Sequence, residues 1–332
     1  MIEREVDFGR PRWMRCNACG REWQVSAEWL DRFDQGDEVC PRCGTDCRAE
    51  NRSDFWVSPD DPSFDDSQVR EMFWYHTSTH ANWPDRAFDP TAGFSDTTRQ
   101  RFNEVGTDGR GLERWAERQK TKALHLGTYE AAVENMFRRI TDQADSNDQF
   151  YLYRVRLTAD AVIEPGVHPE PTNFVGDVQL AEISSPGADI FRYVNTHEDP
   201  SSVSLAVTVW AIQAVQGIAI PLDVDAADPW VKAATARLVV AASQPTPEPR
   251  TALERMRRRM PSVLSVEAGK LEEEIAETLL FWIRERFAAD SDADALTTDP
   301  SLFSSKLLGL ARLVSDSQAA HTALDAAPWR QL

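Results

Sequence analysis

Four cysteines near the N-terminus have the type and spacing of a metal site. Cys16 and Cys19 lie in the stretch CNACG, and Cys40 and Cys43 lie in CPRCG, so 20 residues separate the two C-x-x-C pairs. Four thiolates can form a closed tetrahedral shell around Zn²⁺, which predicts a structural ion and not a catalytic one. The glycine after each pair suits a turn with positive φ. The fifth cysteine, Cys47, is expected to be a free thiol.

This cysteine arrangement resembles the zinc ribbons, and the resemblance covers about 35 residues. Zinc ribbons bind nucleic acids or proteins, and the fold alone does not choose between them. Residues 1–52 carry 9 Arg and 11 Asp or Glu, so this region is close to neutral. We therefore predict a docking module whose partner the sequence does not identify.

A second candidate site begins in the stretch FWYHTSTHAN, residues 73–82. Its aromatic residues predict a strand that ends in the polar side chains His76, Thr77 and Ser78. The stretch KALHLGTYEAAVENM has a related order. There a short strand carries His125 and passes through small residues into a helix.

Together these stretches resemble the ADP-ribosyltransferases of the histidine class, in which one strand ends in His-Gly-Ser or His-Gly-Thr and a second strand passes into a helix. Roughly residues 70–215 are similar to rifamycin ADP-ribosyltransferases and poly(ADP-ribose) polymerases, and more loosely to RNA 2′-phosphotransferases. The third motif of the family is a Glu that leads into a strand. Glu198 in FRYVNTHEDPSSVSLAV matches it, and Glu182 in QLAEISSPG competes.

The resemblance implies an enzyme that uses NAD⁺ as its substrate. His76 would hydrogen-bond ribose hydroxyls, and Thr77 or Ser78 would reach the nicotinamide amide. The imidazole of His125 would stack on the nicotinamide ring. Glu198 would stabilise the oxocarbenium-like state that forms when the glycosidic bond breaks.

Two positions depart from the family pattern. Thr77 stands where the family has Gly, so the backbone would approach the ligand less closely. His125 stands where the family usually has Tyr, and Tyr129, at the start of the helix, is the alternative. A histidine in the second motif is also what the RNA 2′-phosphotransferases use.

Three functions therefore stay open. The first is ADP-ribosyl transfer to a macromolecular target, a protein or a nucleic acid, as in a toxin or a phage–host conflict effector. The second is an NAD-dependent enzyme like the RNA 2′-phosphotransferases. The third is a non-catalytic binding or assembly protein that combines the zinc ribbon with a degenerate form of the transferase fold.

His76 and His80 also raise the possibility of a hydrolytic metal site, because they are four residues apart, with His125 or Asp85 to complete the site. The aromatic and β-branched residues around them favour a strand. Residues four apart in a strand lie far apart along it, which disfavours this interpretation.

The elements that must position these residues fall into three regions. We expect a zinc ribbon over residues 1–52, an ADP-ribosyltransferase-like domain over 53–224 and a helical domain over 225–332. The predicted fold class is α+β, with a split antiparallel sheet flanked by helices in the middle region. In the last region the stretches KLEEEIAETLLFWIRERFAAD and PSLFSSKLLGLARLVSDSQAAHTALDA are each predicted as a helix, and ERMRRRM is the densest basic patch.

Charge and hydropathy limit the partners. The formal charge of −18, from 54 acidic and 36 basic residues, disfavours nucleic acid except at a local basic face. No apolar run reaches 18 residues, and MIEREVDFGRPRW lacks the apolar core of a signal peptide. We expect a cytoplasmic protein without a membrane segment, and the sequence does not indicate an oligomeric state.

Overall fold

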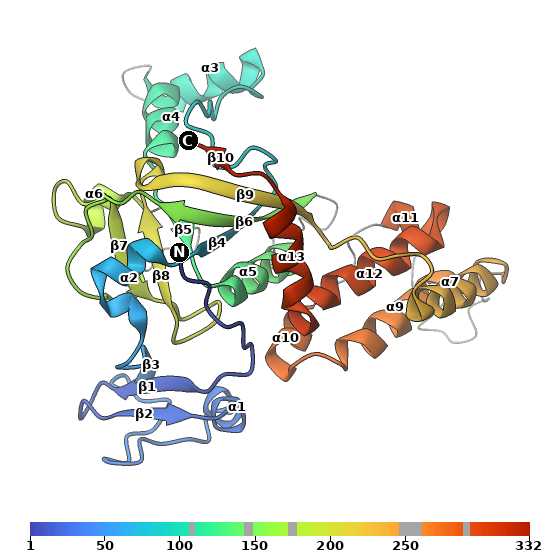
Figure 1. Ribbon diagram of the computed structural model, residues 1–332, viewed down its shortest axis with the longest axis horizontal. Coiled ribbons are helices and arrows are strands. Elements are labelled where there is room, and N and C mark those ends of the chain that lie inside the picture. Colours follow the sequence, from blue (N-terminus) through green and yellow to red (C-terminus); the bar gives the residue numbers. More distant parts are fainter. Residues whose placement is uncertain (106–109, 143–148, 172–177, 246–260, 288–292) are drawn as a thin grey trace.

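The computed structural model describes residues 1–105, 110–142, 149–171, 178–245, 261–287 and 293–332 (Figure 1). Its strands are β1 (Arg12–Cys16), β2 (Glu22–Val25), β3 (Ser53–Trp56), β4 (Trp74–Ser78), β5 (Leu124–Leu126), β6 (Phe150–Leu157), β7 (Ile190–Val194), β8 (Val203–Val207), β9 (Ile212–Ile220) and β10 (Arg330–Gln331). Its α-helices are α1 (Ala27–Gln35), α2 (Asp66–Glu71), α3 (Asp96–Val105), α4 (Gly111–Lys120), α5 (Tyr129–Asp142), α6 (Leu180–Ile183), α7 (Pro229–Ala242), α9 (Val263–Ala276), α10 (Phe281–Arg286), α11 (Ala293–Thr298), α12 (Pro300–Ser315) and α13 (Ser317–Ala326).

The strands form three sheets, and the neighbours within each sheet are antiparallel. The N-terminal sheet has the order β2-β1-β3, and the middle region contains the sheets β10-β9-β6-β4 and β5-β8-β7. The predicted α+β class with antiparallel sheets is therefore confirmed. The stretch SSVSLAVTVWAI, which alternates like one strand, is divided between β8 and a 3₁₀ turn at Val209–Ala211 before β9 begins.

The two middle sheets meet edge to edge at β4 and β5. Tyr75 and Gly127 exchange backbone hydrogen bonds of 2.9 and 3.0 Å across this junction. Glycine is required here because a Cβ at Gly127 would lie 2.8 Å from the Cβ of Ala131. The strand β4 continues through His76 to Ser78, with His76 opposite Tyr153 of β6. His76 is therefore the central residue of β4, which is an edge strand of its sheet, and Thr77 and Ser78 end the strand as predicted.

Two hydrophobic cores fix this junction. One lies around the two middle sheets and includes Trp74, Val155 and Leu205, which are at most 1% exposed. The other packs α5 against the C-terminal helices, with Phe137 of α5 in edge-to-face contact with Phe287 after α10. Because α5 follows β5 directly, burying its apolar face also orients the strand that carries His125.

Near both ends of the chain, backbone pairing joins segments that the sequence analysis assigns to different regions. The N-terminal sheet extends past residue 52, because β3 pairs with β1 in the register Cys16–Ser53 to Trp13–Trp56. Ile2 instead forms a parallel bridge with Met72 in the middle region. At the other end, β10 adds to β9, so the last residues return to the middle sheet (Figure 1).

The last region is helical, but its helices are shorter than predicted. KLEEEIAETLLFWIRERFAAD is not one helix: α9 ends at Ala276 and α10 begins at Phe281. PSLFSSKLLGLARLVSDSQAAHTALDA is divided at Asp316, whose side chain caps the start of α13 by accepting from the backbone N–H of Ala319. The basic patch ERMRRRM lies outside the described residues.

Candidate functional site

A large cleft opens where the two middle sheets meet. It encloses about 1600 Å³, and its walls come from β4 and the loop after it, β5, α5, the β7–β8 loop and the N-terminal sheet. His76, Thr77, His125 and Glu198 all line this cleft, although they lie on separate segments of the chain. This volume exceeds that of a typical small-molecule site.

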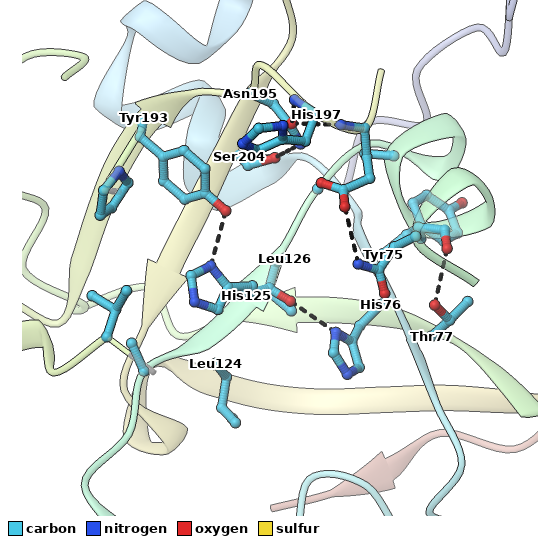
Figure 2. A pocket seen from close by; sticks show the side chains of 18 of the residues that line it. Tyr75, His76, Thr77, Leu124, His125, Leu126, Tyr193, Asn195, His197 and Ser204 are labelled. Atoms are coloured by element: carbon cyan, nitrogen blue, oxygen red, sulfur yellow. Dashed lines mark hydrogen bonds between the residues drawn. The ribbon is translucent and has the colours of Figure 1, made fainter. Parts of the chain in front are cut away.

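His76 lies in the floor of the cleft with a fixed orientation (Figure 2). Its Nδ1 lies 2.8 Å from the backbone carbonyl oxygen of His125. A carbonyl only accepts, so Nδ1 carries the proton and Nε2 is an acceptor. The ring of Trp83 stacks on the imidazole with a centroid separation of 4.0 Å. Burial lowers the pKa of His76 to about 3, which keeps the ring neutral at physiological pH.

His125 faces the cleft beside Tyr193 of β7 (Figure 2). Its Nδ1 lies 2.9 Å from the Tyr193 hydroxyl, whereas its Nε2 is buried without a hydrogen-bond partner among the described residues. Burial lowers the pKa of His125 to about 4, and the nearby negative charge of Glu198 opposes part of this shift. A buried nitrogen without a partner is costly, and a polar ligand in the cleft would relieve that cost.

Glu198 reaches the same cleft from the β7–β8 loop. Its Oε1 accepts hydrogen bonds from Arg138 Nε at 2.6 Å and from Asn135 at 3.3 Å, both on α5. The backbone N–H of Glu198 donates to the side chain of Asn195 at 2.9 Å. The carboxylate is therefore held in place by a charge-assisted pair.

Three of the predicted ligand-binding residues use their polar atoms within the protein. Thr77 donates to the carbonyl of Ala132 at 2.9 Å, and the hydroxyl of Ser78 accepts from the backbone of His80 at 3.1 Å. Ser78 does not line the cleft. Tyr129 does not line it either, since it is 2% exposed and donates to the carbonyl of Leu313. Of the two aromatic candidates in the second motif, only His125 is at the cleft.

The remaining sequence candidates are Glu182 and the histidine metal site. Glu182 forms an exposed ion pair with Arg118 and does not line the cleft. His80 and Asp85 line the cleft, but they are not grouped with His76 or His125 as potential metal ligands in the described part of the chain. The geometry thus gives no support to a histidine metal site there.

The cleft is basic in an otherwise acidic chain. Among the described residues, six basic side chains line it, and four acidic ones do: the basic set is Arg15, Arg86, Lys120, Lys122, Arg138 and Arg139, and the acidic set is Asp54, Asp85, Glu170 and Glu198. The chain as a whole carries −18. A local excess of positive charge in a concave site concentrates anionic ligands.

The four predicted cysteine ligands do converge. The Sγ atoms of Cys16, Cys19, Cys40 and Cys43 all lie within 4.8 Å of one another and could hold a metal ion. Gly20 and Gly44 follow the two pairs and have φ of 69° and 70°, so the predicted turn conformation is confirmed. Cys47 is separate, buried in a small core with Met14, Val25 and Phe33.

Several residues of the cleft escaped the sequence reasoning. Trp83 stacks on His76, Tyr193 binds His125, and Arg138 pairs with Glu198. Arg138 could have been found from helical spacing, because Asn135 and Arg138 are three residues apart on α5 and therefore share a face. Trp83 had no such signal, since it lies in an irregular loop.

Comparison with protein-family models, known proteins and solved structures finds no match to this chain. In the described part of the chain, no helix has the length and apolar character needed to cross a membrane.

Proposed function

We propose that this protein cleaves NAD⁺ and transfers ADP-ribose to a macromolecular acceptor. The observation that carries the proposal is the presence of His76, His125 and Glu198 on one cleft at the junction of two antiparallel sheets. The three residues are the ones that the resemblance to histidine-class ADP-ribosyltransferases singles out.

Each residue has a chemical task that suits its environment. The neutral His76 offers Nε2 as an acceptor for a ribose hydroxyl, since its Nδ1–H is already bound to a carbonyl. The buried Nε2 of His125 can bond a polar group of the nicotinamide half, and its ring can stack on the aromatic base. The basic side chains of the cleft would bind the pyrophosphate.

The chemistry is a substitution at C1′ of the nicotinamide ribose. The bond from C1′ to the pyridinium nitrogen breaks, and nicotinamide leaves with the electron pair as a neutral molecule. The acceptor's nucleophilic atom forms the new bond to C1′ and loses its proton to solvent. Positive charge develops on the ribose in between, and the carboxylate of Glu198 stabilises it. Both described bonds to Glu198 go to Oε1, so Oε2 serves as the acceptor for the substrate.

We also propose that the cysteine cluster holds a structural Zn²⁺ in a ribbon-like module. Zn–S bonds of about 2.3 Å in a tetrahedron place neighbouring sulfurs about 3.8 Å apart. The Sγ distances of 3.7 Å for Cys16–Cys43 and 3.8 Å for Cys19–Cys40 fit this value. Metal analysis of the purified protein should find one zinc per chain, and a value well below one would contradict the site.

The function is tested by nicotinamide release from NAD⁺. Glu198→Gln keeps the shape and the acceptor for Arg138 but removes the charge, so turnover should fall about 100-fold or more while NAD⁺ binding survives. Glu182→Gln is the matched control, because Glu182 is an exposed carboxylate paired with an arginine away from the cleft. Full cleavage by Glu198→Gln would refute its role, and no release by the unaltered protein would refute the proposed activity.

A further inference from the structure

The loop that carries Glu198 has an unusual backbone. Residues 195–202 connect β7 to β8, and within them Asp199 has φ of 48° and Ser201 has φ of 73°. Residues other than glycine rarely adopt positive φ, so contacts from outside the loop must hold this conformation.

Asp199 accounts for one set of these contacts. Its side chain is fully buried, and its Oδ1 accepts from Arg10 at 2.9 Å and forms an ion pair with Arg12 at 3.1 Å. Its Oδ2 accepts from the hydroxyl of Thr128 at 2.7 Å. Its backbone N–H donates to Glu134 of α5 at 3.0 Å. Asp199, the residue next to Glu198, is therefore held through both carboxylate oxygens and through its backbone N–H.

Ser201 accounts for the second set, and in the described part of the chain its side-chain hydrogen bonds all go to the N-terminal sheet. Its hydroxyl oxygen accepts from the backbone N–H of Trp13 at 2.6 Å. The same hydroxyl lies 2.7 Å from the carbonyl of Trp56 and 3.0 Å from that of Trp13, and it donates its proton to these oxygens. Trp13 and Trp56 are direct partners in the β1–β3 ladder.

The strands that hold the loop lead directly into the cysteine cluster. Arg12 and Trp13 begin β1, which ends at Cys16, and Cys16 pairs with Ser53 at the start of β3. A sheet this small, with a core of only a few side chains, depends on cross-links for its shape. Loss of the metal would therefore loosen the two strands on which the loop rests.

We infer that Asp199 and Ser201 are positioning residues for Glu198, and that a metal ion on the cysteine cluster fixes Glu198 in the cleft through β1 and β3. The link from metal to loop is structural, and only its effect on turnover rests on the proposed function. The metal does not touch the substrate in this arrangement. It acts by ordering a loop that is otherwise strained.

Hydrogen exchange measured by mass spectrometry tests the link without an activity assay. The backbone N–H groups of Glu198, Asp199, Ser201 and Ser202 are all hydrogen-bonded, so the loop should be protected in the zinc-loaded protein. Removal of zinc by a chelator should accelerate exchange in residues 195–202 at least tenfold, and zinc should restore protection. The strands β6 and β9 should keep theirs, because their backbones pair with each other from Phe150 to Leu157 and not with the N-terminal sheet.

A pair of variants in zinc-loaded protein isolates the contact. Ser201→Ala removes the hydroxyl that binds Trp13 and Trp56, and it should also accelerate loop exchange at least tenfold. Ser202→Ala is the matched control, because the Ser202 hydroxyl is equally buried in the same loop but has no hydrogen-bond partner in the described residues. It should leave exchange unchanged. If zinc removal also accelerates hydrogen exchange in β6 and β9, the whole protein has loosened. The comparison of Ser201→Ala with Ser202→Ala then tests the inference by itself.

Turnover supplies the readout that separates positioning from general stability. Ser201→Ala should lower kcat for nicotinamide release about tenfold with KM unchanged, because the cleft residues that bind NAD⁺ stay in place. Equal exchange in Ser201→Ala and Ser202→Ala, or a loop unaffected by zinc removal while the rest stays folded, would overturn the inference. Absence of NAD⁺ cleavage with the predicted exchange pattern would instead refute only the proposed function.

Discussion

At the scale of single residues, the cleft is defined by two imidazoles that burial keeps neutral and that differ in their hydrogen bonds. His76 is fixed by a carbonyl on one side and by Trp83 on its face, whereas His125 has one nitrogen on Tyr193 and one without a described partner. Burial lowers the pKa of both. Neither ring is therefore suited to act as a cation near neutral pH, and their value to a ligand lies in hydrogen bonding and stacking.

The protonation of His76 is a direct prediction. At pH 7 its ring should be neutral with the proton on Nδ1, since Nδ1 donates to the His125 carbonyl. In a ¹⁵N-resolved NMR spectrum, Nε2 should have the shift of an unprotonated nitrogen from pH 7 down to pH 5. A protonated Nε2 in this range would contradict the orientation of the ring, and His197, also on the cleft wall, provides a second imidazole for comparison.

The sequence was more informative about these residues than about their partners. His76, His125 and Glu198 could be selected because each lies at a junction between an apolar strand and a polar turn. Tyr129 could not be excluded, because its position at the helix start says nothing about which way its ring points. Only packing against Phe8, Tyr75 and Leu313 settles that it belongs to the core.

At the scale of elements, the sequence identified the type of most segments but not where they bend. The stretch KLEEEIAETLLFWIRERFAAD has uninterrupted helical periodicity, yet the helix is interrupted between Ala276 and Phe281. The break lets Ile275, Leu279 and Ile283 all enter one core while Phe287 reaches Phe137 of α5. Tertiary packing here outweighs local helix propensity, and such packing cannot be predicted from the local sequence pattern.

Replacing either of two helical glycines by alanine should change the free energy of unfolding, in opposite directions. A Cβ at Gly309 in α12 would lie 2.2 Å from the carbonyl oxygen of Leu222, so Gly309→Ala should lower the free energy of unfolding by about 1–3 kcal/mol. A Cβ at Gly269 in α9 meets nothing within 4 Å. Gly269→Ala should therefore raise stability by about 0.5–1 kcal/mol. Urea unfolding followed by circular dichroism measures both, and a stabilising Gly309→Ala would contradict the close contact of α12 with Leu222.

At the scale of the whole molecule, the N-terminal sheet, α5 and the β7–β8 loop are joined by a buried charge cluster. Glu130, Glu134 and Asp199 lie together with Arg12 and are at most 5% exposed. These residues come from three separate segments of the chain, so their meeting could not be predicted from any local pattern. The cluster also explains why α5 carries two glutamates on a buried face, which amphipathic periodicity alone would place in solvent.

This cluster predicts the pH dependence of folding. Burial, and next the charge of Asp199, raise the pKa of Glu134 to about 7 from an ordinary value of 4.5, and Glu130 is raised to about 7 in the same way. The folded state then binds protons more tightly than the unfolded state, so these residues lower stability as pH rises from about 4.5 to 7. The depressed pKa values of His76 and His125, about 3 and 4, have the opposite sign, because the unfolded state takes up their protons first below pH 6.5.

The two effects should nearly cancel between about pH 4.5 and 6.5, so the unaltered protein should show a shallow stability profile there. Glu134→Gln removes one titrating carboxyl and keeps an oxygen that accepts from the Asp199 backbone N–H. Its stability should therefore increase with pH relative to the unaltered protein, by up to about 1.4 kcal/mol per pH unit in this window. Urea unfolding at a series of pH values measures the difference, with the exposed Glu182→Gln as the control for loss of one negative charge. Parallel profiles for Glu134→Gln and the unaltered protein would mean that Glu134 has the same pKa in the folded and unfolded states. That result would contradict its burial between the β7–β8 loop, α5 and the N-terminal sheet.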